Sequence, residues 1–296
     1  MISGPVLPRY LDRTEEKSNH KIMETGSLNK QLTAPEKADD DGKPVIRVMT
    51  YNVHSCVDTN REINPGMIAG IIAELKADIV CLQEVDAPKP LTQNQNQARL
   101  FADQFGMDYC FFPVEKTGLH AFGLAIMSRF SFNEYHHNFL PNLFPRLKPR
   151  KRGAIRASIF TPAGPIHIIN AHLSLFKLER RRQLKTLLGE DWLLAVPPDE
   201  PIIFCGDLNA GPLSKTYRTL TRLLTDVQKG RKNPNPSSSQ PTFHSRSPLF
   251  RIDHIFVSHH FQTINVEVKN TPDTRTASDH LPLVADLELS GIGSRN

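Results

Sequence analysis

Polar side chains of a few chemical kinds stand where the apolar runs of this sequence end. Amide, carboxylate and imidazole groups follow runs such as residues 168–171 and 202–205, which are typical of buried strands. Carboxylate and amide oxygens suit a hard divalent cation, and imidazoles suit proton transfer. The residues concerned are Asn52, Glu84, His172, Asp207, Asn209, Asp253, Asp279 and His280.

Each of these side chains also has an ordinary structural explanation when it is taken singly. Asn52 fits a turn, Glu84 fits a cap of the next segment, and His172 fits a hydrogen-bonded core histidine. Residues 207–209 fit a turn in which an aspartate bonds its own backbone, and residues 279–280 fit a surface pair. Their order along the chain therefore gives them their weight.

Six polar blocks occur in a fixed order along the chain. The blocks are Thr50-Tyr51-Asn52, Leu82-Gln83-Glu84, Asn170-Ala171-His172, Gly206-Asp207-Leu208-Asn209, Arg251-Ile252-Asp253-His254 and Ser278-Asp279-His280. In type and order they resemble the endonuclease/exonuclease/phosphatase superfamily, which includes DNase I, abasic-site endonucleases, neutral sphingomyelinases and inositol polyphosphate phosphatases. The resemblance covers about residues 45–289 and is specific for the superfamily rather than for a substrate.

The resemblance implies an α/β fold of four layers, a DNase I-like sandwich of two packed mixed β-sheets flanked by helices. The site would lie at one end of the sandwich. It also implies hydrolysis of a phosphoester by water with a divalent cation, Mg²⁺ in the first place and Mn²⁺ as a substitute. A hard cation takes one or two carboxylates, so Glu84 would be the first ligand, with Asn52 and Asp279 close by.

The other blocks take catalytic roles from the same resemblance. Asp207 would hold or deprotonate the attacking water, and Asn209 would orient that water or the phosphate. His280 would donate a hydrogen bond to a non-bridging oxygen as imidazolium, with Asp253 holding its ring, since a carboxylate favours the charged histidine. His172 stands where DNase I and sphingomyelinases have histidine and abasic-site endonucleases generally have tyrosine. It would donate to the phosphate or protonate the leaving group.

Four further residues lie close to these blocks. Arg156 is either a substrate-binding residue that faces the phosphate or a solvated strand residue. Leu124 stands where many members of the superfamily carry asparagine after a glycine, so a polar substrate contact is missing there. His54 and His254 are not expected to be catalytic. Because strand side chains alternate, His254 should point away from Asp253.

Strands and helices must bring these blocks together. Apolar runs predict strands over about residues 44–53, 78–84, 109–114, 122–128, 131–137, 153–160, 165–171, 202–205, 252–258, 264–269 and 281–289. Asn64 followed by Pro65 predicts the start of a helix. Further helices are predicted over residues 93–105, 177–195 and 213–224. Many strands with few helices indicate layers built on sheets.

Length and composition fit one large folded domain with tails. The chain has 296 residues, 39% hydrophobic and 23% charged, which excludes a fibrous chain and a disulfide-stapled mini-protein. We expect a disordered polar tail over residues 1–43, a catalytic domain over 44–290 and a C-terminal tail over 291–296. The four cysteines contain no C-x-x-C pair and are expected to be buried thiols. Without a secretory apolar region or a membrane-spanning run, a cytoplasmic protein is expected.

Positive charge gathers in the body of the protein. The chain has a net charge of +5, and basic runs lie within residues 146–156, 177–185 and 215–232. Such runs fit a polyanion, so the expected partner is a phosphodiester of nucleic acid or a phospholipid headgroup, the latter with peripheral contact to an anionic membrane. Residues 139–145 place apolar side chains before a basic run, as an interfacial loop would. A catalytically inactive binding module is the third hypothesis, and the intact blocks argue against it.

Overall fold

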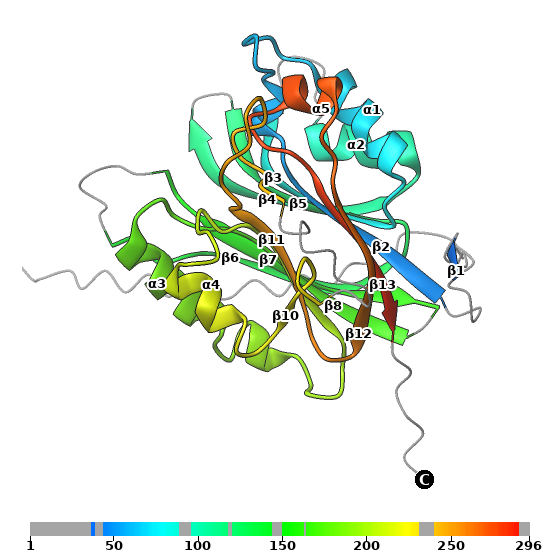
Figure 1. Cartoon of the computed structure of the whole chain (residues 1–296), viewed down its shortest axis with the longest axis vertical. Helices are drawn as coiled ribbons and strands as arrows, with labels where there is room; N and C mark the ends of the chain where they lie inside the picture. Colours follow the sequence, from blue (N-terminus) through cyan, green and yellow to red (C-terminus); the bar gives the residue numbers. More distant parts are fainter. Residues whose placement is uncertain are drawn as a thin grey trace, which may run out of the picture.

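Two β-sheets pack face to face in the computed structural model, and helices cover their outer faces (Figure 1). The structure describes residues 37–38, 44–88, 96–117, 120–143, 150–162, 164–230 and 240–289. The segments expected to be tails, residues 1–43 and 291–296, lie outside this part except for the short strand β1 (Lys37–Ala38). Within the described ranges, no helix has the length and apolar character needed to cross a membrane.

The first sheet has seven strands and carries the N-terminal blocks. Their order is β12-β13-β2-β3-β5-β4, and β1 pairs with β2 beside this path. The pair β2 and β3 is parallel, whereas the other pairs are antiparallel. The bounds are β2 (Pro44–Asn52), β3 (Ile79–Pro88), β4 (Asp108–Thr117), β5 (His120–Ser128), β12 (Phe261–Val268) and β13 (Leu283–Leu289).

The second sheet has six strands in the order β10-β11-β9-β8-β7-β6. The bounds are β6 (Phe132–Phe139), β7 (Gly153–Thr161), β8 (Gly164–His172), β9 (Ile202–Asp207), β10 (Thr225–Asp226) and β11 (Asp253–Val257). The strands β8 and β9 are parallel and end side by side at His172 and Asp207. Asp253, the first residue of the antiparallel β11, pairs with Asp207. The register therefore brings three polar blocks to one edge of this sheet.

The main core lies between the two sheets. Its side chains are mostly aliphatic, and Ile46 of the first sheet and Ile168 of the second belong to one fully buried cluster. Burial on both faces explains why these strands are continuous apolar runs instead of alternating ones. All four cysteines are free and buried, as expected.

Helices complete the four layers, as the resemblance predicts. The helices α1 (Pro65–Leu75), α2 (Gln97–Phe105) and α5 (Pro272–Ala277) contribute to an apolar cluster on the outer face of the first sheet. The helices α3 (Lys177–Leu187) and α4 (Lys215–Leu220) cover the second. Asn64 caps α1 as predicted, since its Oδ1 accepts a hydrogen bond of 3.1 Å from the amide of Met67. Two 3₁₀ turns are η1 (His54–Cys56) and η3 (Leu193–Ala195).

The helix predicted over residues 177–195 is too long. The helix α3 ends at Leu187, and Gly189 turns the chain by donating its amide hydrogen to the carbonyl of Thr186. Trp192 nevertheless belongs to the same apolar cluster as Leu184 and Leu187, so a turn and a helix share one apolar face. That shared face produced a helical pattern beyond the helix. The short helix α5 was not predicted, and α4 is shorter than predicted.

Candidate active site

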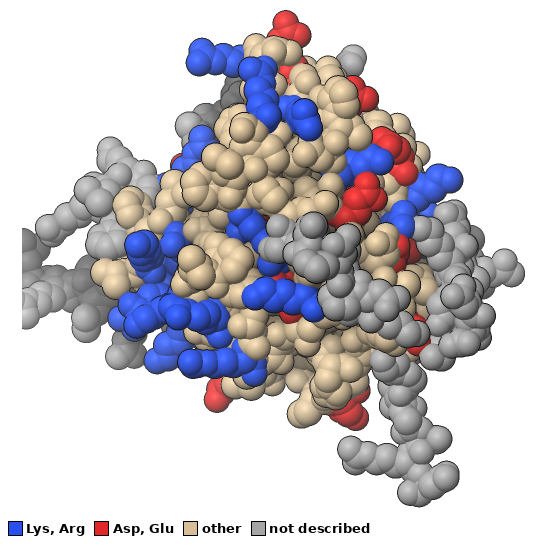
Figure 2. All heavy atoms as spheres, viewed as in Figure 1, with Lys and Arg blue, Asp and Glu red and all other residues tan. Residues whose placement is uncertain are grey.

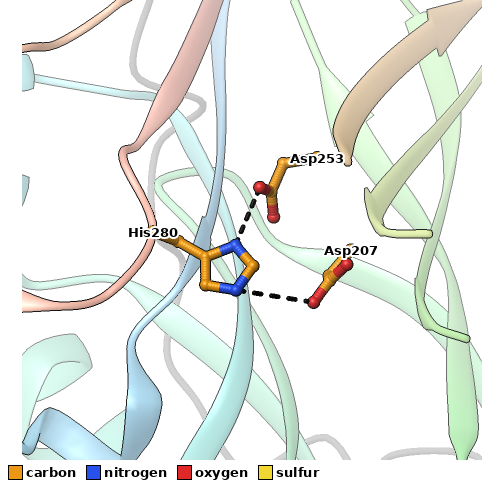
Figure 3. A group of neighbouring side chains, drawn as sticks. All are labelled: Asp207, Asp253 and His280. Atoms are coloured by element: carbon orange, nitrogen blue, oxygen red, sulfur yellow. Dashed lines mark hydrogen bonds and ion pairs between the residues drawn. The ribbon is translucent and has the colours of Figure 1, made fainter. Parts of the chain in front are cut away.

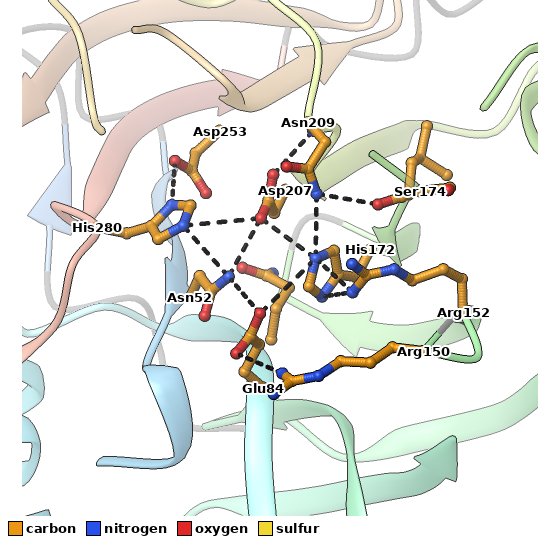
Figure 4. Close-up of polar contacts among 12 residues, drawn as sticks. Asn52, Glu84, Arg150, Arg152, His172, Ser174, Asp207, Asn209, Asp253 and His280 are labelled. Carbon is orange, nitrogen blue, oxygen red and sulfur yellow. Dashed lines mark hydrogen bonds and ion pairs between the residues drawn. The ribbon is translucent and has the colours of Figure 1, made fainter. Parts of the chain in front are cut away.

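The side chain of Asn52 lies where the two sheets meet at one end of the sandwich (Figure 4). Its Nδ2 is 3.3 Å from Oε1 of Glu84 and 3.1 Å from Oδ2 of Asp207. The same nitrogen is 3.5 Å from Nε2 of His280. Asn52 is 1% exposed, so one buried amide joins a carboxylate of the first sheet, a carboxylate of the second sheet and an imidazole.

Glu84 reaches this amide because β3 is irregular at that residue. The pairing of β3 with β5 shifts between Gln83 and Val85, which leaves Glu84 as a bulge. Its φ of 57° lies in the left-handed region that residues other than glycine rarely adopt. Bulges redirect side chains beside functional sites, and backbone strain of this kind costs about 1–3 kcal/mol. The fold therefore holds Glu84 in an unfavourable conformation that aims its carboxylate at Asn52.

Asp207 is placed by the glycine before it. Gly206 has a φ of 131°, and a Cβ there would lie 1.9 Å from the carbonyl oxygen of Ala171 on β8. Only glycine allows the two strands to approach this closely. Beyond it, Asp207 is 2% exposed, and its Oδ1 accepts a hydrogen bond of 2.8 Å from the amide of Asn209. Burial and then the negative charge of Asp253 raise the pKa of the Asp207 carboxyl.

Asp253 and His280 form a buried pair (Figure 3). Nδ1 of His280 is 2.8 Å from Oδ2 of Asp253, which also accepts a hydrogen bond from the hydroxyl of Thr242. Nε2 of His280 faces Oδ2 of Asp207 at 3.8 Å. Burial alone would lower the pKa of His280, but the charge and hydrogen bond of Asp253, with the charges of Asp207 and Asp279, raise that pKa to about 10. His280 is therefore a charged imidazolium at neutral pH.

His172 lies on the opposite side of Asp207 and has a different electrostatic environment. Its Nε2 is 3.3 Å from Oδ2 of Asp207 and 3.2 Å from Nδ2 of Asn209. Nη1 of Arg152 lies 2.7 Å from Nε2 and 3.0 Å from Nδ1 of the same ring. Burial, followed by the positive charge of Arg152, lowers the pKa of His172 well below its ordinary value. The pKa values of the two histidines of the site are thus shifted in opposite directions.

Two arginines at this site were not assigned to it from the sequence. Arg152 touches His172, and Nη1 of Arg150 is 3.7 Å from Oε2 of Glu84 (Figure 4). Both belong to the basic run before β7, which was the available signal. The structure does not bring Arg156 to the site, because its Nη1 lies 3.4 Å from the carbonyl of Trp192 and its Nη2 lies 4.0 Å from Glu134.

The other residues singled out in the sequence lie at the edge of this cluster or outside it. Asp279 is near the pair described above, with Oδ1 4.0 Å from Nε2 of His280. The backbone amide of His54 donates to Oδ1 of Asn52 over 3.1 Å, but its ring bonds the carbonyl of Val57 outside the cluster. His254 points away from the site and bonds the carbonyl of Ala210 over 2.9 Å. Leu124 is 1% exposed in the core between the sheets.

A pair of buried amides fixes the two sheets to each other beneath the site. Nε2 of Gln83 donates to Oδ1 of Asn170 over 2.8 Å, and Nδ2 of Asn170 donates to the carbonyls of Leu82 and Ala125, each over 2.9 Å. Gln83 precedes Glu84, and Asn170 lies two residues before His172. Both amides are fully buried. The bridge therefore ties the relative position of the sheets to the positions of the site residues.

The donor set fits a divalent cation. Asp207 and Asp253 each offer a carboxylate oxygen within 4.8 Å of the other and of a ring nitrogen of His280. The charged His280 has no lone pair to give a cation, so the oxygen ligands come from the carboxylates. Oδ1 of Asp253 is buried and has no hydrogen-bond partner among the described residues. Glu84 and Asp207 share the amide of Asn52, which brings their two carboxylates close together. Carboxylate and amide oxygens are the ligands that Mg²⁺ takes in proteins.

This fold and site define a class of protein. A two-sheet sandwich whose common end gathers buried carboxylates, amides and a carboxylate-paired histidine is a scaffold for hydrolysis of phosphoester bonds. The chain belongs to the Endonuclease/Exonuclease/phosphatase family, whose model matches residues 49–280. All six sequence blocks lie within that range, so the family expected from them is confirmed.

Known relatives agree with this assignment. The uncharacterized protein YbhP of Escherichia coli is 26% identical over 259 residues, which cover 82% of this chain and 96% of YbhP. The endonuclease/exonuclease/phosphatase structure from Beutenbergia cavernae superposes with a TM-score of 0.71 at 23% identity, covering 84% of this chain and 72% of that one. ANGEL2, a 2′,3′-cyclic phosphatase solved with adenosine-2′,3′-vanadate, superposes with a TM-score of 0.64 at 19% identity, covering 83% and 96% of the two chains. These likenesses support the fold.

Proposed function

We propose that the protein hydrolyses a phosphodiester with the help of a divalent cation, Mg²⁺ for preference. One observation carries the proposal: Nδ2 of Asn52 lies within 3.5 Å of Glu84, Asp207 and His280 at once. A cation ligand, a base for water and a charged donor for the phosphate therefore converge on one point. A catalytically inactive binder has no need for this convergence.

Asp207 acts on the water. Its carboxylate is buried, and its raised pKa makes it a better proton acceptor than an ordinary aspartate. Asn209 is held by its own bond to Asp207 and by a hydrogen bond of 3.0 Å from its Nδ2 to the carbonyl of Leu173. It orients the attacking water or the phosphate. Asp207 takes one proton from the water, the water oxygen adds to phosphorus, one ester P–O bond breaks, and the departing oxygen takes a proton from solvent.

His280 and Arg152 act on the phosphate. Since Asp253 holds the imidazolium of His280 from behind, its Nε2 is free to donate to a non-bridging oxygen, where charge develops in the transition state. Arg152 supplies a second positive charge beside His172. Because that guanidinium favours neutral His172, His172 contributes a hydrogen bond to the phosphate and does not act as the imidazolium acid.

Glu84 would hold the cation together with Asn52, which would ligate through Oδ1, the atom that also accepts the amide hydrogen of His54. Asp279 is the next oxygen ligand available. A bound cation supplies charge neutralisation at the phosphoryl and leaving oxygens. ANGEL2 is a 2′,3′-cyclic phosphatase, which supports a diester substrate for a chain of this fold.

The test compares a diester with a monoester and one carboxylate with another. Purified protein is assayed with bis(p-nitrophenyl) phosphate and p-nitrophenyl phosphate, and then with plasmid DNA, RNA and phospholipid vesicles. Each assay is run with Mg²⁺ and with a chelator. Metal-dependent diester cleavage should fall about a thousand-fold or more in Asp207→Asn and remain unchanged in Asp199→Asn, an exposed control. Equal turnover by Asp207→Asn, or full activity in chelator, would overturn the proposal.

A further inference from the structure

Large apolar side chains are exposed on the loops that surround the site. Leu213 is 91% exposed, Leu249 is 76% exposed and Leu175 is 68% exposed. Leu175 follows His172 by three residues, and Leu213 follows Asn209 by four. Phe176, Leu178 and Phe250 are exposed beside them. A water-soluble surface gains nothing from leucines in these positions, so their grouping indicates a partner.

Basic side chains line the space between these loops. A cavity of about 320 Å³ lies between the starts of α3 and α4, and Leu213 forms part of its wall. Its charged lining is entirely basic: Lys177, Arg180, Arg181, Lys215 and Arg218. A neighbouring cavity of about 420 Å³ shares Leu213 and Ser214 and continues to Leu249 and Phe250. Lys and Arg gather over α3 and α4 in Figure 2. We call this continuous basic and apolar area the α3–α4 surface.

The fold fixes this surface in place. Nη1 of Arg180 donates to the carbonyls of Ser174 and Leu175 over 2.9 and 2.7 Å, and the amide of Ser174 donates to Gln183 over 2.9 Å. Leu175 is therefore held outward by a buried arginine on α3. The exposure of Leu175 therefore belongs to a loop that hydrogen bonds hold in one conformation.

The surface extends to the other side of α3. The amide of Leu143 donates to Glu179 over 3.2 Å, which fastens the end of the β6 loop to the helix. Leu143 is 38% exposed and Phe139 is 43% exposed. Nζ of Lys151 lies 5.3 Å from the centre of the Phe139 ring. Residues 144–145, the end of the interfacial loop expected over residues 139–145, lie outside the described residues.

We propose that the α3–α4 surface docks the protein on an anionic lipid bilayer, with the site facing the headgroups. Exposed leucines would enter the interface, and the basic cavity would hold lipid phosphates. The substrate is then a membrane lipid phosphodiester, a part of the inference that rests on the proposed hydrolase. The docking itself needs no catalysis.

The side chains favour a bilayer over a nucleic acid. Single-stranded nucleic acids are held by aromatic side chains that stack on bases, whereas the most exposed residues here are leucines. Leucine has no stacking face, but it is stabilised when it leaves water for the acyl boundary. The basic charge alone suits either an anionic bilayer or a nucleic acid, so the exposed leucines are the reason to favour the bilayer.

The experiment is sedimentation of the full chain with vesicles. Vesicles of phosphatidylcholine alone are compared with vesicles containing one third phosphatidylglycerol, at low and high salt. The carrier protein is Asp207→Asn, so binding is measured without turnover. Leu213→Ser with Leu249→Ser removes the apolar part, and Lys177→Glu with Arg181→Glu removes charge. Leu194→Ser and Arg99→Glu are exposed controls outside the α3–α4 surface, at 68% relative exposure for Leu194 and on α2 for Arg99.

The protein should bind the anionic vesicles and not phosphatidylcholine alone. The leucine pair should weaken binding about ten-fold, the charge pair at least about twenty-fold, and the controls less than about two-fold. In the active background, both pairs should keep hydrolysis of a soluble diester and lose hydrolysis of vesicle lipid. Equal binding to both vesicles, or unchanged binding by both pairs, would overturn the docking. Tighter binding to DNA that both pairs weaken would assign the surface to nucleic acid. Binding without any hydrolysis would count against the proposed function alone.

Discussion

Gly206→Ala tests whether the close approach of β9 to β8 determines the position of Asp207 in the site. The added Cβ would lie 1.9 Å from the carbonyl oxygen of Ala171, with two more atoms of Ala171 at 2.9 and 3.0 Å. The strands would have to separate by at least about 1 Å for this contact to reach 3.0 Å, the shortest distance that a Cβ shows. Residue 206 would also keep a positive φ, which favours glycine.

The magnitude follows from these contacts. Loss of two strand hydrogen bonds costs about 2 kcal/mol, and the strained backbone adds about 2 kcal/mol. A loss of about 4 kcal/mol lowers the Tm of a domain of this size by about 10 °C. Because Asp207 is the next residue, a shift of about 1 Å should also lower kcat about a hundred-fold.

Gly70→Ala is the matched control. A Cβ at Gly70, inside α1, meets nothing within 4 Å. Alanine in a helix interior is about 1 kcal/mol better than glycine, so this variant should unfold at a slightly higher temperature and keep full activity. Thermal unfolding followed by circular dichroism and diester hydrolysis measure both variants. A Gly206→Ala protein with the Tm and kcat of the wild type would refute the reasoning.

Two further outcomes are expected. Burial lowers the pKa of His254 to about 4, so this neutral histidine stabilises the fold above about pH 6.5 and loses about 3 kcal/mol as the pH falls toward 4. Urea unfolding gives the free energy of unfolding at pH 7.5 and at pH 4.5, and the difference between the two values should be about 3 kcal/mol smaller in His254→Phe than in the wild type. An unchanged difference would show that His254 does not cause the loss of stability. Glu84→Gln should raise the Mg²⁺ concentration for half-maximal activity about ten-fold or more. An unchanged Mg²⁺ titration would exclude ligation by Glu84.

The fold could be predicted because the apolar pattern and the polar blocks agree. Buried strands are continuous apolar runs, four of which end at a block and two of which begin at one. The runs indicated layers built on sheets, and the resemblance carried by the blocks implied the sandwich. The helix over residues 177–195 was overpredicted because Trp192 shares the apolar face of α3 after the chain has turned. Periodicity records which side is buried, and a turn can continue that side.

The site could be predicted only where a block carried its own pattern. Asn52, Glu84 and Asp207 were found because they follow recognisable strands, and the structure brings them together. Arg156 was chosen from the basic run, whereas Arg152 reaches the site. Four residues separate the two, and a sequence does not show where a strand leaves the edge of its sheet. Thr242 had no signal, because its contact with Asp253 depends on how the segment between the two residues folds back.

The buried bridge between Gln83 and Asn170 orients the two sheets when the protein folds. Each sheet holds some of the groups proposed to react, and the bridge fixes the two sets relative to each other in the folded protein. Orientation entropy is therefore lost once, during folding, and not again in every catalytic cycle. The groups proposed to react therefore come together without a movement of one sheet against the other. The exposed loops around the site are then available for the docking on a bilayer that we propose.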